Sequence, residues 1–152
     1  MGLDMFFYGR RYLWLADDHS KKGAIAALFP ELRGRGIEID EIKAEFKYWR
    51  KANAIHNWFV QNVQNGIDEC QEAEVPIEKL YELRDTCAAV MASPDQASVL
   101  LPSTGGFFFG NTEYDAWYFD HVKETLQWLN NFLLKETFDQ FKNWSFYYRS
   151  SW

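Results

Sequence analysis

The pattern of apolar and polar residues changes from strand-like to helix-like in the middle of the chain. From Ile42 to Tyr48 every second residue is apolar or aromatic and the residues between are charged. A period of two predicts a strand with one side facing solvent. From Trp49 onward the apolar positions recur every three or four residues, so we predict a helix over Trp49–Gln64 that ends at an Asn-Gly pair.

The inward stripe of this predicted helix holds two polar residues. Asn53 and His56 share it with Trp49, Phe59 and Val63. Burying an amide or an imidazole costs free energy unless the group finds a hydrogen-bonding partner. The stripe therefore predicts either a satisfied polar network that joins strand to helix or a polar pocket, and the sequence leaves both open.

The remaining segments predict an α+β fold in a single domain, residues 1–152. Pro76 opens a helix with an apolar stripe that extends to Met91, and Thr112–Asp115 has the form of a capping box before a helix that reaches Phe132. A short helix or an irregular segment is expected over Lys21–Phe29. Period and composition predict strands at Leu3–Tyr8, Tyr12–Leu15, Glu72–Val75, Phe107–Phe109 and Phe146–Trp152. We expect a small, largely antiparallel sheet against about three main helices.

Composition and charge exclude several functional classes. The chain has 152 residues, including 7 Trp, 8 Tyr and 13 Phe, and a formal charge of −6. An acidic chain without a basic patch disfavours direct nucleic-acid binding, and the many rings favour recognition. Cys70 and Cys87 lack metal-ligand spacing, and the N-terminus resembles no signal or lipidation motif. We expect a cytoplasmic protein without membrane contact, metal or cofactor.

A candidate ligand site lies along the predicted central helix. Trp49, Arg50, Asn53, His56 and Asn57 supply a stacking ring, a guanidinium, two amides and an imidazole. This set suits a small planar anionic ligand, because a guanidinium binds phosphate or carboxylate and a ring stacks on a base. The alternative is a buried network with no ligand.

A second group of residues is expected to complete this site. Phe107 and Phe109 lie between glycines, a sequence that would let a ligand approach backbone amides near the next helix. Tyr114 and His121 would add a ring and an imidazole from that helix, with His121 facing His56 across a cleft. The alternatives are a buried sheet strand and a core histidine bonded to a carbonyl.

Catalysis has little support in the sequence. The chain has no Gly-x-Ser-x-Gly, His-Glu-x-x-His or paired Cys-x-x-Cys motif. Acid–base chemistry by His56 with Asp68 or Asp115 is the remaining route, and it would make the protein a small hydrolase or transferase. We therefore expect a binding protein more than an enzyme.

The chain resembles a family of small, functionally unassigned proteins of phages and some bacteria. The matching segments are Met1–Met5, Tyr48–Phe59, Gly106–Gly110, Tyr114-Asp115 and Ser150–Trp152. The resemblance implies a phage-type accessory protein in the host cytoplasm and transfers no mechanism. Between Gly9 and Ile37 no pattern matches this family, which makes that segment the expected place for a partner-specific function.

Two functions follow as hypotheses. The first is a phage-type protein that interferes with a host process such as defence by sequestering a nucleotide-like ligand. The second is an anti-defence antagonist, for example of the anti-CRISPR type, that blocks a host protein through its acidic charge and exposed aromatics. For this second function we expect four exposed tryptophans, namely Trp14, Trp58, Trp144 and Trp152. The sequence leaves homo-oligomers open.

Overall fold

A four-stranded antiparallel sheet forms the base of the fold and confirms the α+β class. The computed structural model describes residues 2–152. The strand order is β2-β1-β4-β3, with β1 and β4 in the centre. The strands are β1 (Asp4–Tyr12), β2 (Glu41–Arg50), β3 (Ala73–Glu74) and β4 (Ser145–Ser151).

Three helices correspond to the three main ones that were expected, but the described residues contain six α-helices, about twice the predicted number. The three are α2 (Asn53–Asn62), α3 (Ile77–Ala92) and α5 (Ala116–Phe132). The others are α1 (Asp18–Ala27), α4 (Ala97–Leu100) and α6 (Lys135–Phe138), with 3-10 turns at Pro30–Leu32, Pro94–Gln96 and Asp139–Phe141. Among residues 2–152 no helix combines the length and apolar character needed to span a membrane.

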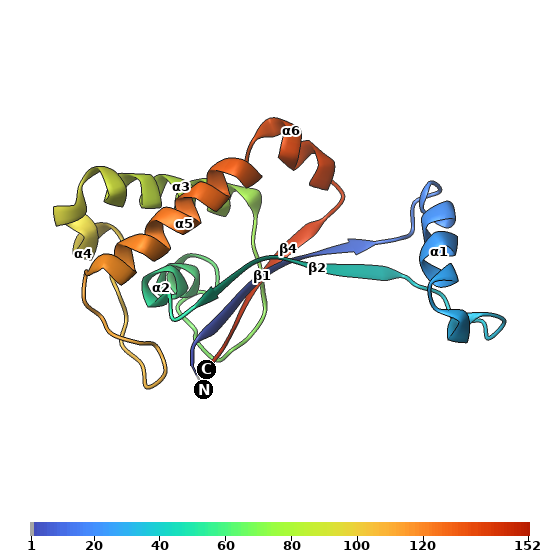
Figure 1. The fold of residues 1–152 in the computed structure, drawn as a ribbon, viewed down its shortest axis with the longest axis horizontal. Coiled ribbons are helices and arrows are strands. Elements are labelled where there is room, and N and C mark those ends of the chain that lie inside the picture. Colours follow the sequence, from blue (N-terminus) through green and yellow to red (C-terminus); the bar gives the residue numbers. More distant parts are fainter. Residues whose placement is uncertain (1) are drawn as a thin grey trace.

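The core lies between one face of the sheet and the helices (Figure 1). Phe7 of β1 meets Trp128 of α5 edge-on, with ring centroids 5.2 Å apart. Tyr148 of β4 stacks on Phe59 of α2 at 4.0 Å and an interplanar angle of 6°. Rings in these geometries contribute about 0.5–1.5 kcal/mol per pair beyond their burial. The aromatic content of the chain is therefore used largely for packing.

A β-bulge in β2 explains why the predicted start of the central helix is wrong. Phe7 pairs with Lys47 while Tyr8 pairs with Glu45, so one extra residue, Phe46, is inserted in β2. The insertion reverses the alternation, and Trp49, not Tyr48, is buried. The strand continues through Arg50, and α2 begins only at Asn53.

Two other predicted elements differ from the structure. The opening segment is one continuous strand and not two, because Gly9 lies where a side chain would collide. A Cβ there would be 2.7 Å from the Phe46 ring and 2.9 Å from the Trp144 ring. The Phe107–Phe109 segment forms a turn and not a strand.

Residues 13–40, here called the arm, extend from the far ends of β1 and β2. The arm contains α1 and the turn at Pro30–Leu32, and Figure 1 shows it projecting away from the rest of the molecule. The hydrogen bond from Leu13 N to Asp40 O, over 2.8 Å, links the two ends of the arm next to β1 and β2. The arm is thus held at one end only.

Candidate functional site

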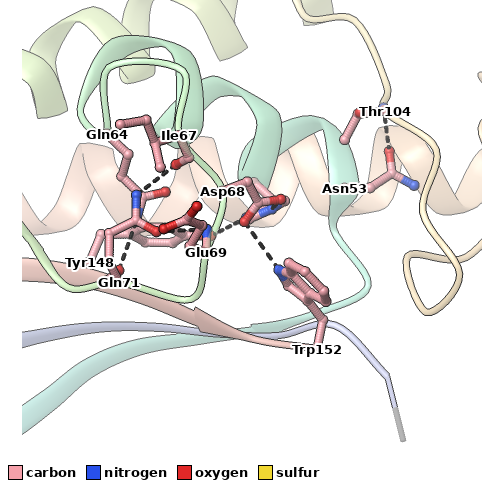
Figure 2. Close-up of polar contacts among 10 residues, drawn as sticks. Asn53, Gln64, Ile67, Asp68, Glu69, Gln71, Thr104, Tyr148 and Trp152 are labelled. Atoms are coloured by element: carbon pink, nitrogen blue, oxygen red, sulfur yellow. Dashed lines mark hydrogen bonds and ion pairs between the residues drawn. The ribbon is translucent and has the colours of Figure 1, made fainter.

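Asn53 stands at the first turn of α2, and its side chain is fully engaged within the protein. Its Nδ2 donates to the carbonyl oxygens of Phe109 and Asn111, at 3.2 and 2.7 Å. Its Oδ1 accepts from the amide of Thr104 at 3.3 Å, a contact visible in Figure 2. The amide therefore fixes the glycine-rich loop to the helix and has no free donor for a ligand.

His56 is fully buried one turn later and is also satisfied. Its Nε2 lies 2.9 Å from Oδ2 of Asp68, and its Nδ1 lies 2.8 Å from the hydroxyl of Tyr148. Because a carboxylate only accepts, Nε2–H donates to Asp68, and in the neutral imidazole Nδ1 accepts from Tyr148. Burial lowers the pKa of His56, and contact with Asp68 only partly opposes this. The histidine is held neutral.

Trp152 contacts the outer side of this network, at Asp68 and Phe109. The indole of Trp152 donates from Nε1 to Oδ1 of Asp68 (Figure 2). The ring of Phe109 covers His56 edge-on at 5.1 Å and also meets the Trp152 ring at 5.9 Å. Three other segments thus meet around the imidazole of α2: the loop with Asp68, the loop with Phe109, and the C-terminal segment with Tyr148 and Trp152.

The arrangement of Asp68, His56 and Tyr148 resembles an acid–base relay but lacks an accessible end. The Tyr148 hydroxyl would be the nucleophile, yet this side chain is completely buried and stacked on Phe59. Burial also raises the pKa of Tyr148 well above its ordinary value. A nucleophile must touch its substrate, so this geometry gives His56 a structural role.

A small cavity does lie beside Asn53, at the start of α2. Its lining includes Trp117 and His121 of α5. The Nε2 atom of His121 is buried and has no hydrogen-bond partner among the described residues. Burial also lowers the pKa of His121, against the influence of Glu124. The cavity measures about 20 Å³, which is room for a water molecule and far too little for a nucleotide.

The other residues predicted on the central helix are dispersed. Trp49 is buried in β2 and donates from Nε1 to Thr125 Oγ1 at 2.8 Å. Arg50 is exposed at the end of the same strand. Asn57 donates to the carbonyl of Pro102 at 3.2 Å. The predicted combination of stacking ring and guanidinium is not assembled, because both residues belong to strand β2, where successive side chains point to opposite faces.

The residues predicted to complete the site are likewise separated. Phe109 is buried against His56, whereas Phe107 is 94% exposed at the loop tip. Tyr114 precedes α5, which Asp115 caps by accepting from Tyr118 N, so the predicted capping box at Thr112 is wrong. His121 contacts Trp117 and not His56.

Sequence reasoning underestimated Tyr148 and Trp152 as partners in this network. The terminal strand was predicted, and its alternation places Phe146, Tyr148 and Ser150 on the buried face. That alternation was the available signal for Tyr148. No local pattern connects Trp152 with Asp68, since they are 84 positions apart.

Most apolar side chains of the arm are exposed or half-buried. Within it only Leu13 and Asp18 are buried. The exposed fractions are 77% for Trp14, 47% for Leu15, 74% for Leu28, 45% for Phe29 and 52% for Ile37. Of the other tryptophans expected at the surface, Trp152 is exposed, Trp144 is half-buried and Trp58 is buried.

A buried carboxylate orders the arm. Asp18 accepts from Arg11 at 2.8 Å, from Lys21 at 3.2 Å and from the amide of Leu15 at 3.2 Å. Burial alone would raise the pKa of Asp18, but these three partners outweigh it and lower the pKa. The arm is therefore shaped by polar contacts at its base and not by an apolar core of its own.

The charged residues of the arm nearly balance. It carries Lys21, Lys22, Arg33 and Arg35 against Asp17, Asp18, Glu31, Glu38 and Asp40, a net charge of −1. Lys21 pairs with Asp18 and Lys22 with Glu38, whereas Arg33 and Arg35 form no ion pair with any residue from 2 to 152. The arm thus offers exposed apolar side chains and two unpaired guanidinium groups.

Comparison with protein-family models, curated proteins and solved structures finds no match to this chain.

Proposed function

We propose that this chain is a non-catalytic protein-binding protein whose arm docks onto a partner protein. The observation that carries this proposal is the set of exposed apolar side chains on a segment that projects from the body and buries almost none of them. Each such side chain, once covered by a partner, contributes about 1.5–3 kcal/mol. A few of them are enough for a specific complex.

The chemistry of the arm defines the partner. Leu28, Phe29 and Ile37 require an apolar surface, and the unpaired guanidinium groups of Arg33 and Arg35 favour carboxylates at its rim. Opposite charges of this kind accelerate association and exclude other partners. Because the arm projects from the body, it can enter a concave surface of the partner that a flat face could not enter.

The resemblance to phage accessory proteins supports a host protein as this partner and interference with host defence as the setting. It also supports action in the host cytoplasm. The protein-antagonist hypothesis is thereby favoured over the sequestration of a nucleotide-like ligand, with one change: the contact surface is mainly apolar and carries two unpaired arginines, and it does not depend on acidic charge.

Sequestration of a small planar anion remains a second candidate function. The cavity next to Asn53 is too small for it, and His56 and Asn53 have no free donors. The uncovered face of the sheet offers a different place, described below.

Substitution of the arm's apolar residues tests the proposal. Leu28→Ser combined with Phe29→Ser should weaken capture of the partner by at least tenfold when tagged protein is purified from host cells. The matched control is Val99→Ser on α4, because Val99 and Leu28 are equally exposed, at 74%. Size-exclusion chromatography of each variant shows whether it remains folded.

The outcomes separate clearly. Partner loss in the arm variant but not in Val99→Ser supports docking through the arm. Equal capture by both variants would contradict it. If the captured partner is a second copy of this chain, the arm is a self-association element and the antagonist function falls.

A further inference from the structure

The face of the sheet opposite the helices carries an open hollow of about 350 Å³. This volume lies in the range of small-molecule sites and is far larger than the cavity beside Asn53. Strands β1, β2 and β4 each contribute alternate residues from their outer sides. The lining consists of Phe6, Tyr8, Lys43, Glu45, Arg149 and Ser151.

Two cations border this hollow without a carboxylate partner. Neither Lys43 nor Arg149 forms an ion pair with any residue of the described chain, 2–152. By contrast Arg10, two positions beyond Tyr8 on β1, is bound by Glu41 and Glu72 at 3.5 and 2.9 Å. The hollow therefore holds two cations against the single carboxylate of Glu45, and a guanidinium and an ammonium both bind anions.

Tyr8 provides an independent observation. Tyr8 is only 2% exposed, and its hydroxyl has no hydrogen-bond partner in the described chain. The ring is enclosed by Tyr147, stacked at 5.8 Å, and by the Lys43 ammonium, 3.7 Å from the ring centroid. A buried hydroxyl without a partner costs free energy, and native proteins seldom retain one without a reason.

Phe6 supplies the apolar part of the hollow. Its ring contacts Tyr48 at 5.5 Å and 47°, and the side chain is only half-buried. The two rings Phe6 and Tyr8 lie two positions apart on one strand, so both point to the same face. The ring of Phe6 is therefore available for stacking, next to the two cations.

We propose that this hollow binds a small anion carrying a planar ring. The ring of the ligand stacks on Phe6, its phosphate or carboxylate lies between Lys43 and Arg149, and the Tyr8 hydroxyl donates to that anion. Glu45 and Ser151 accept from amino or hydroxyl groups of the ring or its sugar. The site is separate from the arm and does not depend on the partner-binding function.

Calorimetry with the full chain tests the site with four compounds. Adenosine monophosphate has a ring and a phosphate, and indole-3-carboxylate has a ring and a carboxylate. Adenosine lacks the anion, and inorganic phosphate lacks the ring. At least one of the first two should bind ten or more times tighter than the last two, and the stronger of them identifies the anionic group. Failure of both to bind at millimolar concentration would overturn the proposal.

Three variants locate the binding. Tyr8→Phe keeps the ring and removes only the unpartnered hydroxyl, so it should fold normally and weaken binding about tenfold. Arg149→Gln should weaken it by a similar factor, whereas Lys123→Gln on α5 is the matched control and should have no effect. Unchanged affinity in both Tyr8→Phe and Arg149→Gln would place the ligand elsewhere and refute the site. Arm variants should bind the compound normally, which separates this test from that of partner docking.

Discussion

The indole of Trp152 donates a hydrogen bond over 3.1 Å to the carboxylate of Asp68, which holds the last residue of the chain against the loop after α2. The other oxygen of Asp68 accepts from His56, so one carboxylate joins the chain end to a buried imidazole. Both ring nitrogens of His56 and both amide hydrogens of Asn53 are bound within the protein. These polar residues of α2 therefore contribute stability to the fold.

Removal of the Asp68 carboxylate should destabilise the protein. Asp68→Ala leaves the buried Nε2–H of His56 without an acceptor, which costs about 1–3 kcal/mol of the free energy of unfolding. Urea denaturation measures the loss. Asp85→Ala is the control, because Asp85 pairs with Arg84 at the surface, where such pairs contribute about 0–1 kcal/mol. Equal losses in the two variants would show that the His56 contact is unimportant.

Stability should fall as the solution becomes acidic. Burial lowers the pKa of His56 and of His121 in the folded protein, so the unfolded chain binds protons more readily. The stabilisation is complete above the unfolded value of about 6.5 and is lost as the pH falls below it. Melting temperatures between pH 7.5 and 5 measure this, and His56→Gln should reduce the slope. A melting temperature that rises as the pH falls from 7.5 to 5 would contradict the lowered pKa of the two histidines.

Two buried tyrosines should respond oppositely to loss of their hydroxyls. Tyr148→Phe removes the partner of His56 Nδ1 and should cost about 1–3 kcal/mol, while Tyr8→Phe removes a hydroxyl without a partner and should cost nothing or stabilise. Thermal denaturation of both variants provides the comparison. A larger loss in Tyr8→Phe would mean that its hydroxyl is satisfied within the fold.

The arm should loosen without unfolding of the body when Asp18 is changed. Asp18→Asn removes the charge that binds Arg11 and Lys21 at the base of the arm. Hydrogen exchange should then become faster in residues 13–40 and stay unchanged in α3 and α5, since local regions open independently when few buried contacts tie them to the core. Uniformly faster exchange would show that arm and body fold as one unit.

The fold class followed from the sequence because the apolar periods of most segments were clear. The buried stripe of α3 and the terminal strand β4 both appeared where they were predicted. The start of α2 was missed because the bulge at Phe46 adds one residue to β2, and a bulge leaves no mark in a pattern of apolar positions. Lys51, with φ of 55°, completes the turn into the helix, in a conformation uncommon for lysine.

The candidate site was harder to predict than the fold. The polar stripe was identified correctly as inward-facing, but its partners come from distant segments, as with Tyr148, 92 positions from His56. Whether a buried polar group is satisfied depends on such contacts, which no local spacing reveals. The segment between Gly9 and Ile37 was expected to hold any partner-specific function, and the structure forms the exposed arm from most of it.

The most direct test of docking through the arm is site-specific photo-crosslinking in host cells. A photoreactive residue replaces Leu28 in one protein and the equally exposed Val99 in another. The account predicts one host protein crosslinked strongly from position 28 and absent from position 99. The same set of crosslinked proteins from both positions, or none from position 28, would contradict it.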